Sequence, residues 1–85
     1  MAQKDTKDFK FDIVRHIAVI SQAGQAGRIK ELNKIIWNGN SPKYDIRSWS
    51  QDHTVIGKGI TLTAEELRLL KKAIDSEIAM LDEDD

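Results

Sequence analysis

Two tryptophans and a few nearby cations are the residues in this 85-residue chain whose types and spacing could do chemistry. Trp37 precedes a turn cluster, Asn38-Gly39-Asn40-Ser41-Pro42, and after the turn Lys43, Arg47 and Trp49 alternate onto one face of an extended segment. Flat side chains that stack on bases, beside cations that contact phosphates, are the groups that hold single-stranded nucleic acid. If the two segments pair antiparallel across the turn, we expect both indoles near one end of a sheet, on its open face. The alternative is that each tryptophan is a core or rim residue.

Catalytic chemistry has no comparable pattern in the sequence. His16 alternates onto a strand face and His53 sits in a turn, so each is interpreted as a surface or partly packed histidine. The segment Gly57-Lys58-Gly59 lacks the longer spacing and the following Ser or Thr of a phosphate-binding loop. We therefore expect a protein that is not an enzyme and that holds no metal and no cofactor.

The size and composition favour a single small domain that needs a partner subunit. At 9.6 kDa the chain has little core, and without cysteine it cannot use disulfides for support. Since the sequence contains no apolar run of membrane-spanning length and no hydrophobic signal segment, we expect a cytoplasmic protein with no membrane partner.

The charge is polarised along the chain although the total is only −1. Residues 9–62 contain eight Lys and Arg against four acids, whereas residues 63–85 contain three against eight. A basic body with an acidic end indicates an anionic partner on one side of the molecule, or a solvated surface without a partner.

The hydrophobic pattern predicts an α+β fold, with four strands of one antiparallel sheet followed by one C-terminal helix. Residues 1–8 are interpreted as a flexible leader, 9–81 as the domain and 82–85 as an acidic tail. The expected strands cover residues 9–21, 28–38, 43–50 and 55–62, with a glycine-containing hairpin loop at 22–27. Segment 28–38 also has Ile29, Leu32 and Ile36 at roughly helical spacing; we favour a strand because hairpin and turn signals flank it.

The helix has the clearest start signal in the chain. Thr63 is a typical N-cap residue, Glu66 completes a capping box three residues later, and Leu62 and Leu67 are spaced to form a hydrophobic staple. The periodicity ends at Leu81, and the acids that follow oppose the helix dipole, so we expect the last residues to fray.

An apolar stripe on this helix is wider than one sheet requires. Apolar side chains cover about half of the cylinder, whereas roughly 100° suffices for a helix lying on one sheet. We therefore expect a homodimer joined through the helices; the alternative is that the long first hairpin covers the flank. The expected interface residues are Leu70, Ala73, Ile74, Ile78 and Leu81.

Two motifs resemble a known family. The string Tyr44-Asp-Ile-Arg-Ser-Trp49, a polar turn, and Gly57-Lys-Gly-Ile-Thr-Leu62 running into Thr63-Ala-Glu-Glu-Leu67 resemble the C-terminal domain of the positive cofactor four family of transcriptional coactivators, particularly its bacterial YdbC-type members. The resemblance covers roughly residues 11–81. It implies a curved four-stranded sheet plus one helix, a homodimer, and single-stranded DNA bound across the sheets with little sequence preference, in transcription, replication or repair.

The same resemblance implies roles for single residues. Arg47 and Lys58 match cations that contact phosphates, Trp37 matches a stacking aromatic on the second strand, and Trp49 matches an aromatic after the Asp-Ile-Arg strand. Further basic candidates are Lys30, Lys34, Lys43 and Arg28. Ser50 stands where eukaryotic members carry a second aromatic, and Ile56-Gly57 replaces a more basic approach to Lys58. RNA binding and a protein-interaction module of the transcription or replication machinery are the alternative functions.

Overall fold

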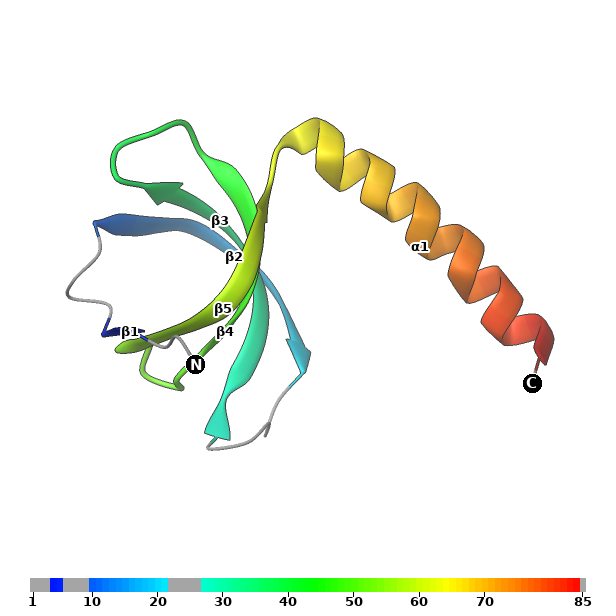
Figure 1. Cartoon of the computed structure of the whole chain (residues 1–85), viewed down its shortest axis with the longest axis horizontal. Coiled ribbons are helices and arrows are strands. Elements are labelled where there is room, and N and C mark those ends of the chain that lie inside the picture. The colour runs from blue at the N-terminus through cyan, green and yellow to red at the C-terminus, as the bar shows by residue number, and fades with distance from the viewer. Residues whose placement is uncertain (1–3, 6–9, 22–26, 85) are drawn as a thin grey trace.

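The expected order of four strands and one helix is confirmed by the computed structural model, which describes residues 4–5, 10–21 and 27–84 (Figure 1). The elements are β1 (Lys4–Asp5), β2 (Phe11–Ser21), β3 (Ile29–Trp37), β4 (Lys43–Trp49), β5 (Val55–Leu62) and α1 (Ala64–Asp84). All neighbouring strands are antiparallel, in the order β1-β5-β4-β3-β2. Segment 28–38 is a strand and not a helix, and most of the predicted loop at 22–27 lies outside the described residues.

The short strand β1 lies in the segment interpreted as a flexible leader. Lys4 pairs with Ile56, and Asp5 pairs with Val55, at the start of β5. The expectation of an unstructured leader is therefore wrong for these two residues, because the otherwise free edge of β5 offers them backbone partners.

The turn between β3 and β4 has the geometry that its sequence predicts. Asn38 and Gly39 both have positive φ, 53° and 73°, which these two residue types tolerate best. The amide of Asn40 donates to the carbonyl of Trp37 at 2.9 Å, which closes the turn. A tight hairpin thus follows from local backbone preference.

The sheet is strongly curved, and its concave side, called here the inner face, contains the core. Ile35, Trp49 and Ile56 are buried there, with Phe11, Ile13 and Trp37 packed against them. Three register shifts between β2 and β3 help β2 to bend around this core. The opposite, outer face carries the alternate residues, among them Leu32, Ile46 and Ile60.

The predicted capping box is present at the start of α1. The Thr63 amide donates to Oε1 of Glu66 at 2.8 Å, and the Glu66 amide donates to Oγ1 of Thr63 at 3.1 Å. These two bonds satisfy backbone donors that the first turn of a helix leaves free.

A Thr63→Ala variant is expected to lose about 1 kcal/mol of unfolding free energy, because the cap hydroxyl that accepts from Glu66 disappears. Thr63→Ser keeps a hydroxyl and should lose much less. Urea unfolding followed by circular dichroism compares the three proteins; equal midpoints for Thr63→Ala and the wild type would contradict this role.

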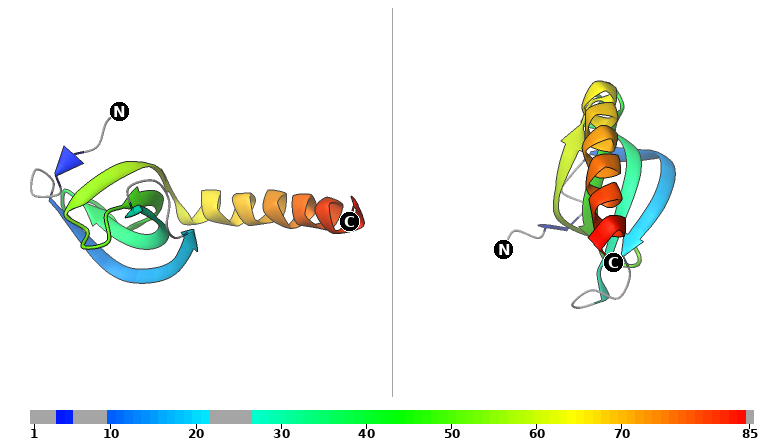
Figure 2. Two further views of the ribbon diagram at one scale, coloured as in Figure 1. Left: turned by 90° about the horizontal axis from the view of Figure 1, so that it is seen from below. Right: turned by 90° about the vertical axis from the view of Figure 1, so that its right-hand side faces the viewer.

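Beyond its first turns, α1 projects away from the sheet (Figure 2). Its apolar side chains are consequently exposed, including Leu69 (58%), Ile74 (45%), Ile78 (46%), Met80 (59%) and Leu81 (56%). The helix continues beyond the end of its apolar periodicity at Leu81, as far as Asp84. In the part of the chain that the structure describes, no helix is long and apolar enough to cross a membrane.

Candidate nucleic-acid interface

Trp37 and Arg47 form the aromatic and cationic pair of the inner face. Trp37 ends β3 and is half-buried, and the Arg47 guanidinium carbon lies 5.0 Å from the centroid of its ring. Both line an open hollow of about 240 Å³ together with Asn38, Ile56 and Thr61. An indole, a guanidinium and two small polar side chains around one hollow suit a planar ligand with polar edges.

The guanidinium of Arg47 is held in place by a buried carboxylate. Its Nε donates to Oδ1 of Asp45 at 2.7 Å, its Nη2 donates to Oδ2 at 2.8 Å, and its Nη1 donates to the Gly57 carbonyl at 3.2 Å. Asp45 is fully buried, the Arg47 side chain is 16% exposed, and the Thr61 hydroxyl donates to Oδ2 of Asp45 at 3.2 Å. This bidentate pair fixes both the position and the plane of the guanidinium.

Trp49 is a core residue, so the expectation that it faces solvent is wrong. Its side chain has no exposed surface, and its ring centroid lies 5.5 Å from that of Phe11 and 5.1 Å from that of His53. Alternation correctly places Trp49 on the face of Arg47, but the curvature of the sheet encloses this part of that face. A base could not stack on this ring without opening the core.

The two tryptophans also lie at opposite ends of the β3–β4 pairing. Trp49 is paired with Ile29 at one end, whereas Trp37 lies beyond the pair of Ile35 and Lys43 at the other. The expectation of two indoles near one end of the sheet is therefore wrong. Phe11, 5.5 Å from each indole ring between centroids, joins them through the core.

Three of the predicted basic residues lie on the outer face, opposite Trp37. Strand alternation and register place Lys30, Lys34 and Lys58 there, and the Lys34 ammonium lies 5.8 Å from the ring centroid of Tyr44. The grouping of these lysines with the indoles on one face is therefore wrong. Lys30 and Lys58 do line a second hollow of about 400 Å³, which also includes Arg47, Ile46, Gly59 and Ile60.

The segment Gly57-Lys58-Gly59 is required for close packing of β5 on β4. A Cβ atom at Gly59 would overlap the Arg47 Cβ and the Ile46 carbonyl, and one at Gly57 would overlap the Ser48 side chain. Glycine is needed at both positions because the strands approach each other so closely.

The remaining basic candidates lie at the two ends of the hairpin. Lys43 is exposed and begins β4 beside the end of β3, on the same face as Arg47. Arg28 is half-buried and precedes β3, at the far end from Trp37. The structure therefore brings Trp37, Arg47 and Lys43 to one face, without Arg28.

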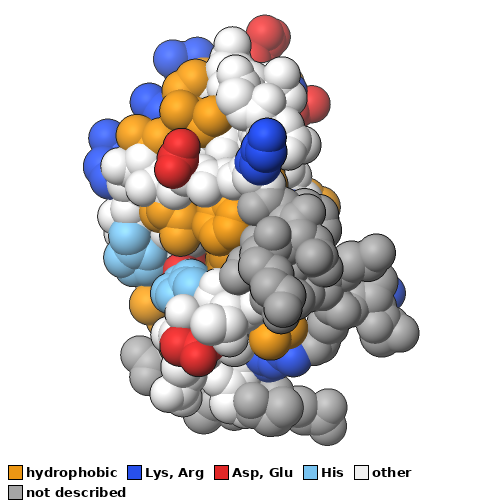
Figure 3. Space-filling view, turned by 90° about the vertical axis from the view of Figure 1, so that its left-hand side faces the viewer, with side chains coloured by type: hydrophobic (Ala, Val, Ile, Leu, Met, Phe, Trp, Pro, Cys, Tyr) orange, Lys and Arg blue, Asp and Glu red, His pale blue; other side chains and the backbone are white. Residues whose placement is uncertain are grey.

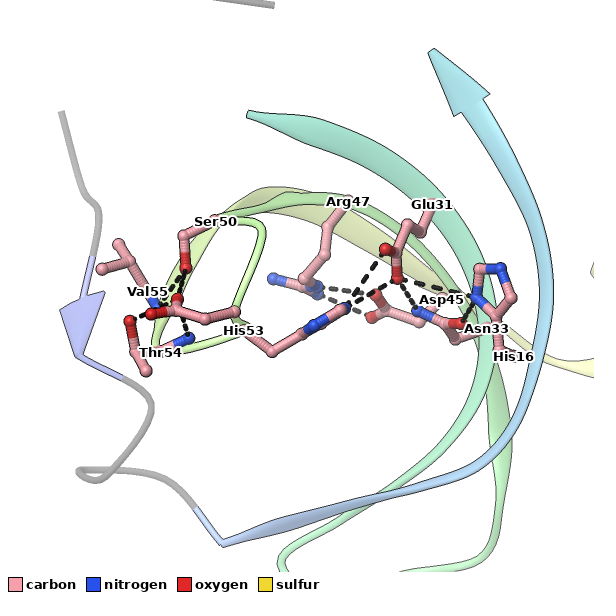
Figure 4. A network of polar contacts seen from close by, with 10 residues as sticks. His16, Glu31, Asn33, Asp45, Arg47, Ser50, His53, Thr54 and Val55 are labelled. Carbon is pink, nitrogen blue, oxygen red and sulfur yellow. Dashed lines mark hydrogen bonds and ion pairs between the residues drawn. The ribbon is translucent and has the colours of Figure 1, made fainter. Parts of the chain in front are cut away.

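A second polar cluster connects β2, β3 and the β4–β5 turn (Figure 4). The buried carboxylate of Glu31 accepts from Nδ2 of Asn33 at 3.0 Å and from Nε2 of His53 at 3.0 Å, and Nδ1 of His16 is 2.8 Å from Oδ1 of Asn33. Glu31 is 4% exposed and Asn33 fully buried. Figure 3 shows the histidine side chains close together on this side of the molecule, next to hydrophobic surface.

The turn after β4 places His53 over this cluster. Oδ1 of Asp52 accepts from the Ser50 hydroxyl at 2.9 Å and from the amide and hydroxyl of Thr54 at 3.1 and 2.7 Å. The bonds from Thr54, then that from Ser50, lower the pKa of Asp52 to about 2. The turn also holds His53 at a φ of 61°, a conformation uncommon outside glycine and asparagine.

The environment of Glu31 keeps its carboxyl ionised. Burial by itself raises the pKa of Glu31, but hydrogen bonds from Asn33 and His53 and the charges of His53 and His16 outweigh it and hold the pKa below its ordinary value of 4.5. Three elements are therefore tied together by one buried negative charge. Among the described residues no group of His, Cys, Asp and Glu side chains is arranged to hold a metal ion.

Sequence reasoning missed Asp45, Glu31 and Asn33. A signal for them exists, because the odd-numbered residues of β3 and β4 share the inner face. Asp45 therefore falls beside Arg47, and Glu31 beside Asn33. Polar residues on a face that also contains Ile35 and Trp49 must find partners.

Comparison with known proteins adds independent findings. The family model described as Transcriptional Coactivator p15 (PC4) matches residues 25–73. A protein of Treponema pallidum, described as uncharacterized, is 41% identical over 69 residues, covering 81% of this chain and 80% of its own length. The matched residues include the Trp37 and Arg47 hollow and the first turns of α1.

Proposed function

Because the chain belongs to the transcriptional coactivator p15 (PC4) family, we propose that it binds single-stranded DNA as a homodimer and catalyses no reaction. The binding tolerates different sequences because every base offers a π-face to an aromatic or guanidinium plane. Such binding serves processes in which DNA strands are separated: transcription, replication or repair.

The observation that carries this proposal is the hollow lined by Trp37 and Arg47. Its volume of about 240 Å³ is open to solvent, and its walls combine an indole with a guanidinium. Stacking on such groups contributes roughly 1–3 kcal/mol per base. Trp49 contributes to binding only indirectly, because it belongs to the core against which Trp37 packs.

Phosphates are proposed to contact Lys43 on the inner face and the lysines of the second hollow on the outer face. Lys30 and Lys58 line the second hollow of about 400 Å³, and because Arg47 lines both hollows, the two are adjacent. Lys43 is exposed on the inner face. Affinity should therefore fall with salt, since phosphate contacts release counterions.

The homodimer is proposed from the uncovered apolar surface of α1. Ile74 and Ile78, two residues of the predicted interface, are about half exposed in the single chain. Between the first turns of α1 and the outer face lies a further hollow of about 400 Å³, whose apolar lining is Ile20, Leu32, Ile46, Leu67, Leu70 and Ile74. A second copy of the helix would cover this surface.

A Trp37→Ala variant tests the proposed function. It should bind a labelled oligothymidine about tenfold or more weakly than the wild type, because one stacking platform is lost. Fluorescence anisotropy, with duplex DNA and a matched RNA oligomer as competitors, measures both affinity and preference. If the RNA oligomer competes more strongly than the matched single-stranded DNA, RNA replaces DNA as the proposed ligand.

Tyr44→Ala provides the matched control, since it removes an aromatic ring from the adjacent strand on the outer face. Its affinity should remain close to that of the wild type. The proposal fails if the wild type binds no single strand, or if the folded Trp37→Ala variant retains full affinity.

A further inference from the structure

We propose that Arg47 serves as a stacking plate for a nucleobase and not as a phosphate-neutralising cation, and that Asp45 is the positioning residue that holds it. The inference rests on the proposed function and assigns a chemical role to each member of this pair. It differs from the role of phosphate contact that the sequence resemblance implies for Arg47.

Three of the five N–H donors of Arg47 are already used within the protein. Nε and Nη2 donate to the two carboxylate oxygens of Asp45 at 2.7 and 2.8 Å, and Nη1 donates to the Gly57 carbonyl at 3.2 Å. A phosphate oxygen could use only the remaining hydrogens of Nη1 and Nη2, and drawing the guanidinium away from the bidentate pair would leave the fully buried carboxylate of Asp45 without its charged partner. Neutralising a phosphate is therefore an unfavourable use of this guanidinium.

The plane of the guanidinium, in contrast, is suited to stacking. Hydrogen bonds along the edge of the guanidinium do not use its faces, and its carbon already lies over the Trp37 ring at a centroid distance of 5.0 Å, in a stacking arrangement. Both groups line the hollow of about 240 Å³. Because Asp45 cancels the charge, the pair presents a nearly neutral planar surface, which suits an uncharged base more than a phosphate.

Asp45 is positioned to do this by contacts on a second strand. Its Oδ2 accepts from the Thr61 hydroxyl at 3.2 Å as well as from Arg47, so the carboxylate is fixed from β4 and β5. Asp45 itself is fully buried, so its side chain is not accessible to a base or a phosphate. Its effect on binding must therefore pass through Arg47.

Two substitutions of Arg47 separate stacking from phosphate contact. Arg47→Lys keeps the charge but loses the plane, and should weaken oligothymidine binding roughly tenfold. Arg47→Gln loses the charge but can still donate to Asp45, and should leave the slope of log affinity against log salt unchanged. If Arg47 neutralised a phosphate, Arg47→Lys would retain affinity and Arg47→Gln would make the slope shallower by about 0.7.

Asp45→Asn tests the positioning role through the same salt slope, which a merely structural defect would not steepen. Freed from its carboxylate, Arg47 should contact a phosphate, so the slope should become steeper by about 0.7. An unchanged slope in a folded Asp45→Asn protein overturns the positioning role, and if this variant does not fold, the Arg47 variants decide the stacking role. Failure of the wild type to bind overturns the proposed function as well, whereas the phosphate-type pattern overturns this inference alone.

Discussion

An Ile78→Asp variant is expected to sediment as a monomer of 9.6 kDa under conditions where the wild type sediments as a dimer. Ile78 lies on the apolar side of α1 and is 46% exposed in the single chain. Burying an aspartate without a partner at the proposed helix interface should cost about 3 kcal/mol or more, which corresponds to roughly a hundredfold increase in the dimer dissociation constant. Sedimentation equilibrium over a range of protein concentrations measures this change.

Ala79→Asp is the matched control for this experiment. Ala79 is the next residue in α1 and lies about half a turn around the helix from Leu70, on the polar side. The same acid is therefore added at almost the same distance from the helix C-terminus, so its unfavourable interaction with the helix dipole is nearly the same in the two variants. This variant should remain a dimer.

The reason to expect a large difference is the amount of apolar surface that the chain leaves uncovered. Burying one Leu or Ile side chain contributes roughly 1.5–3 kcal/mol, and α1 presents several of them beyond its contact with the sheet. A monomeric wild type, or a dimer that tolerates Ile78→Asp, would show that α1 is not the interface.

The hairpin and the cap could be predicted from the sequence because both depend on local chemistry. Asn38-Gly39 tolerates positive φ, and Thr63 with Glu66 satisfies the first amides of α1, whatever the rest of the chain does. Alternation also predicted correctly that Arg47 and Trp49 share a face. These rules act over a few residues, so one sequence is sufficient to apply them.

The burial of Trp49 could not be predicted in this way. Alternation gives the face of a residue but not the curvature of the sheet, and here the curvature encloses Trp49 while leaving Trp37 at the open end. That curvature depends partly on register shifts in β2, which have no clear sequence signal. In contrast, the outer-face position of Lys30 and Lys34 follows from counting residues back from Trp37, so strand alternation is sufficient to predict it.

The structure also changes how the candidate site is understood, because it separates the predicted cations into two groups. Lys30 and Lys58 line a hollow on the outer face, whereas Arg47 is neutralised by Asp45 on the inner face. Charge and stacking are therefore proposed to act at adjacent but different places. A sum of basic residues in the sequence cannot distinguish a cation that is free to bind phosphate from one that is paired internally.

A Glu31→Gln variant is expected to lose about 1–3 kcal/mol of unfolding free energy at pH 7, because the amide cannot replace the charged partner of His53. The carboxylate of Glu31 is 4% exposed and connects β3 to the β4–β5 turn through His53 and, through Asn33, to His16 on β2. Urea unfolding at equal protomer concentration, followed by tryptophan fluorescence, measures the loss. The buried ring of Trp49 reports on opening of the core.

The effect of Glu31→Gln should depend on pH in one direction. The pKa of Glu31 is lower in the folded chain than its ordinary value of 4.5, so its ionised form stabilises the fold above pH 4.5, and this contribution is lost as the pH falls through the folded pKa. The wild type and the variant should therefore differ above pH 4.5 and converge in acid.

Glu65→Gln separates a network effect from the loss of any negative charge. Glu65 is exposed in the first turn of α1, away from the inner face, and its substitution should change stability by a few tenths of a kcal/mol at most. A difference between the wild type and Glu31→Gln that stays constant from neutral to acid pH would contradict the role of the Glu31 charge. Convergence for Glu31→Gln alone would show that one buried carboxylate holds β2 and the turn against the sheet, and so keeps the core beneath Trp37 closed.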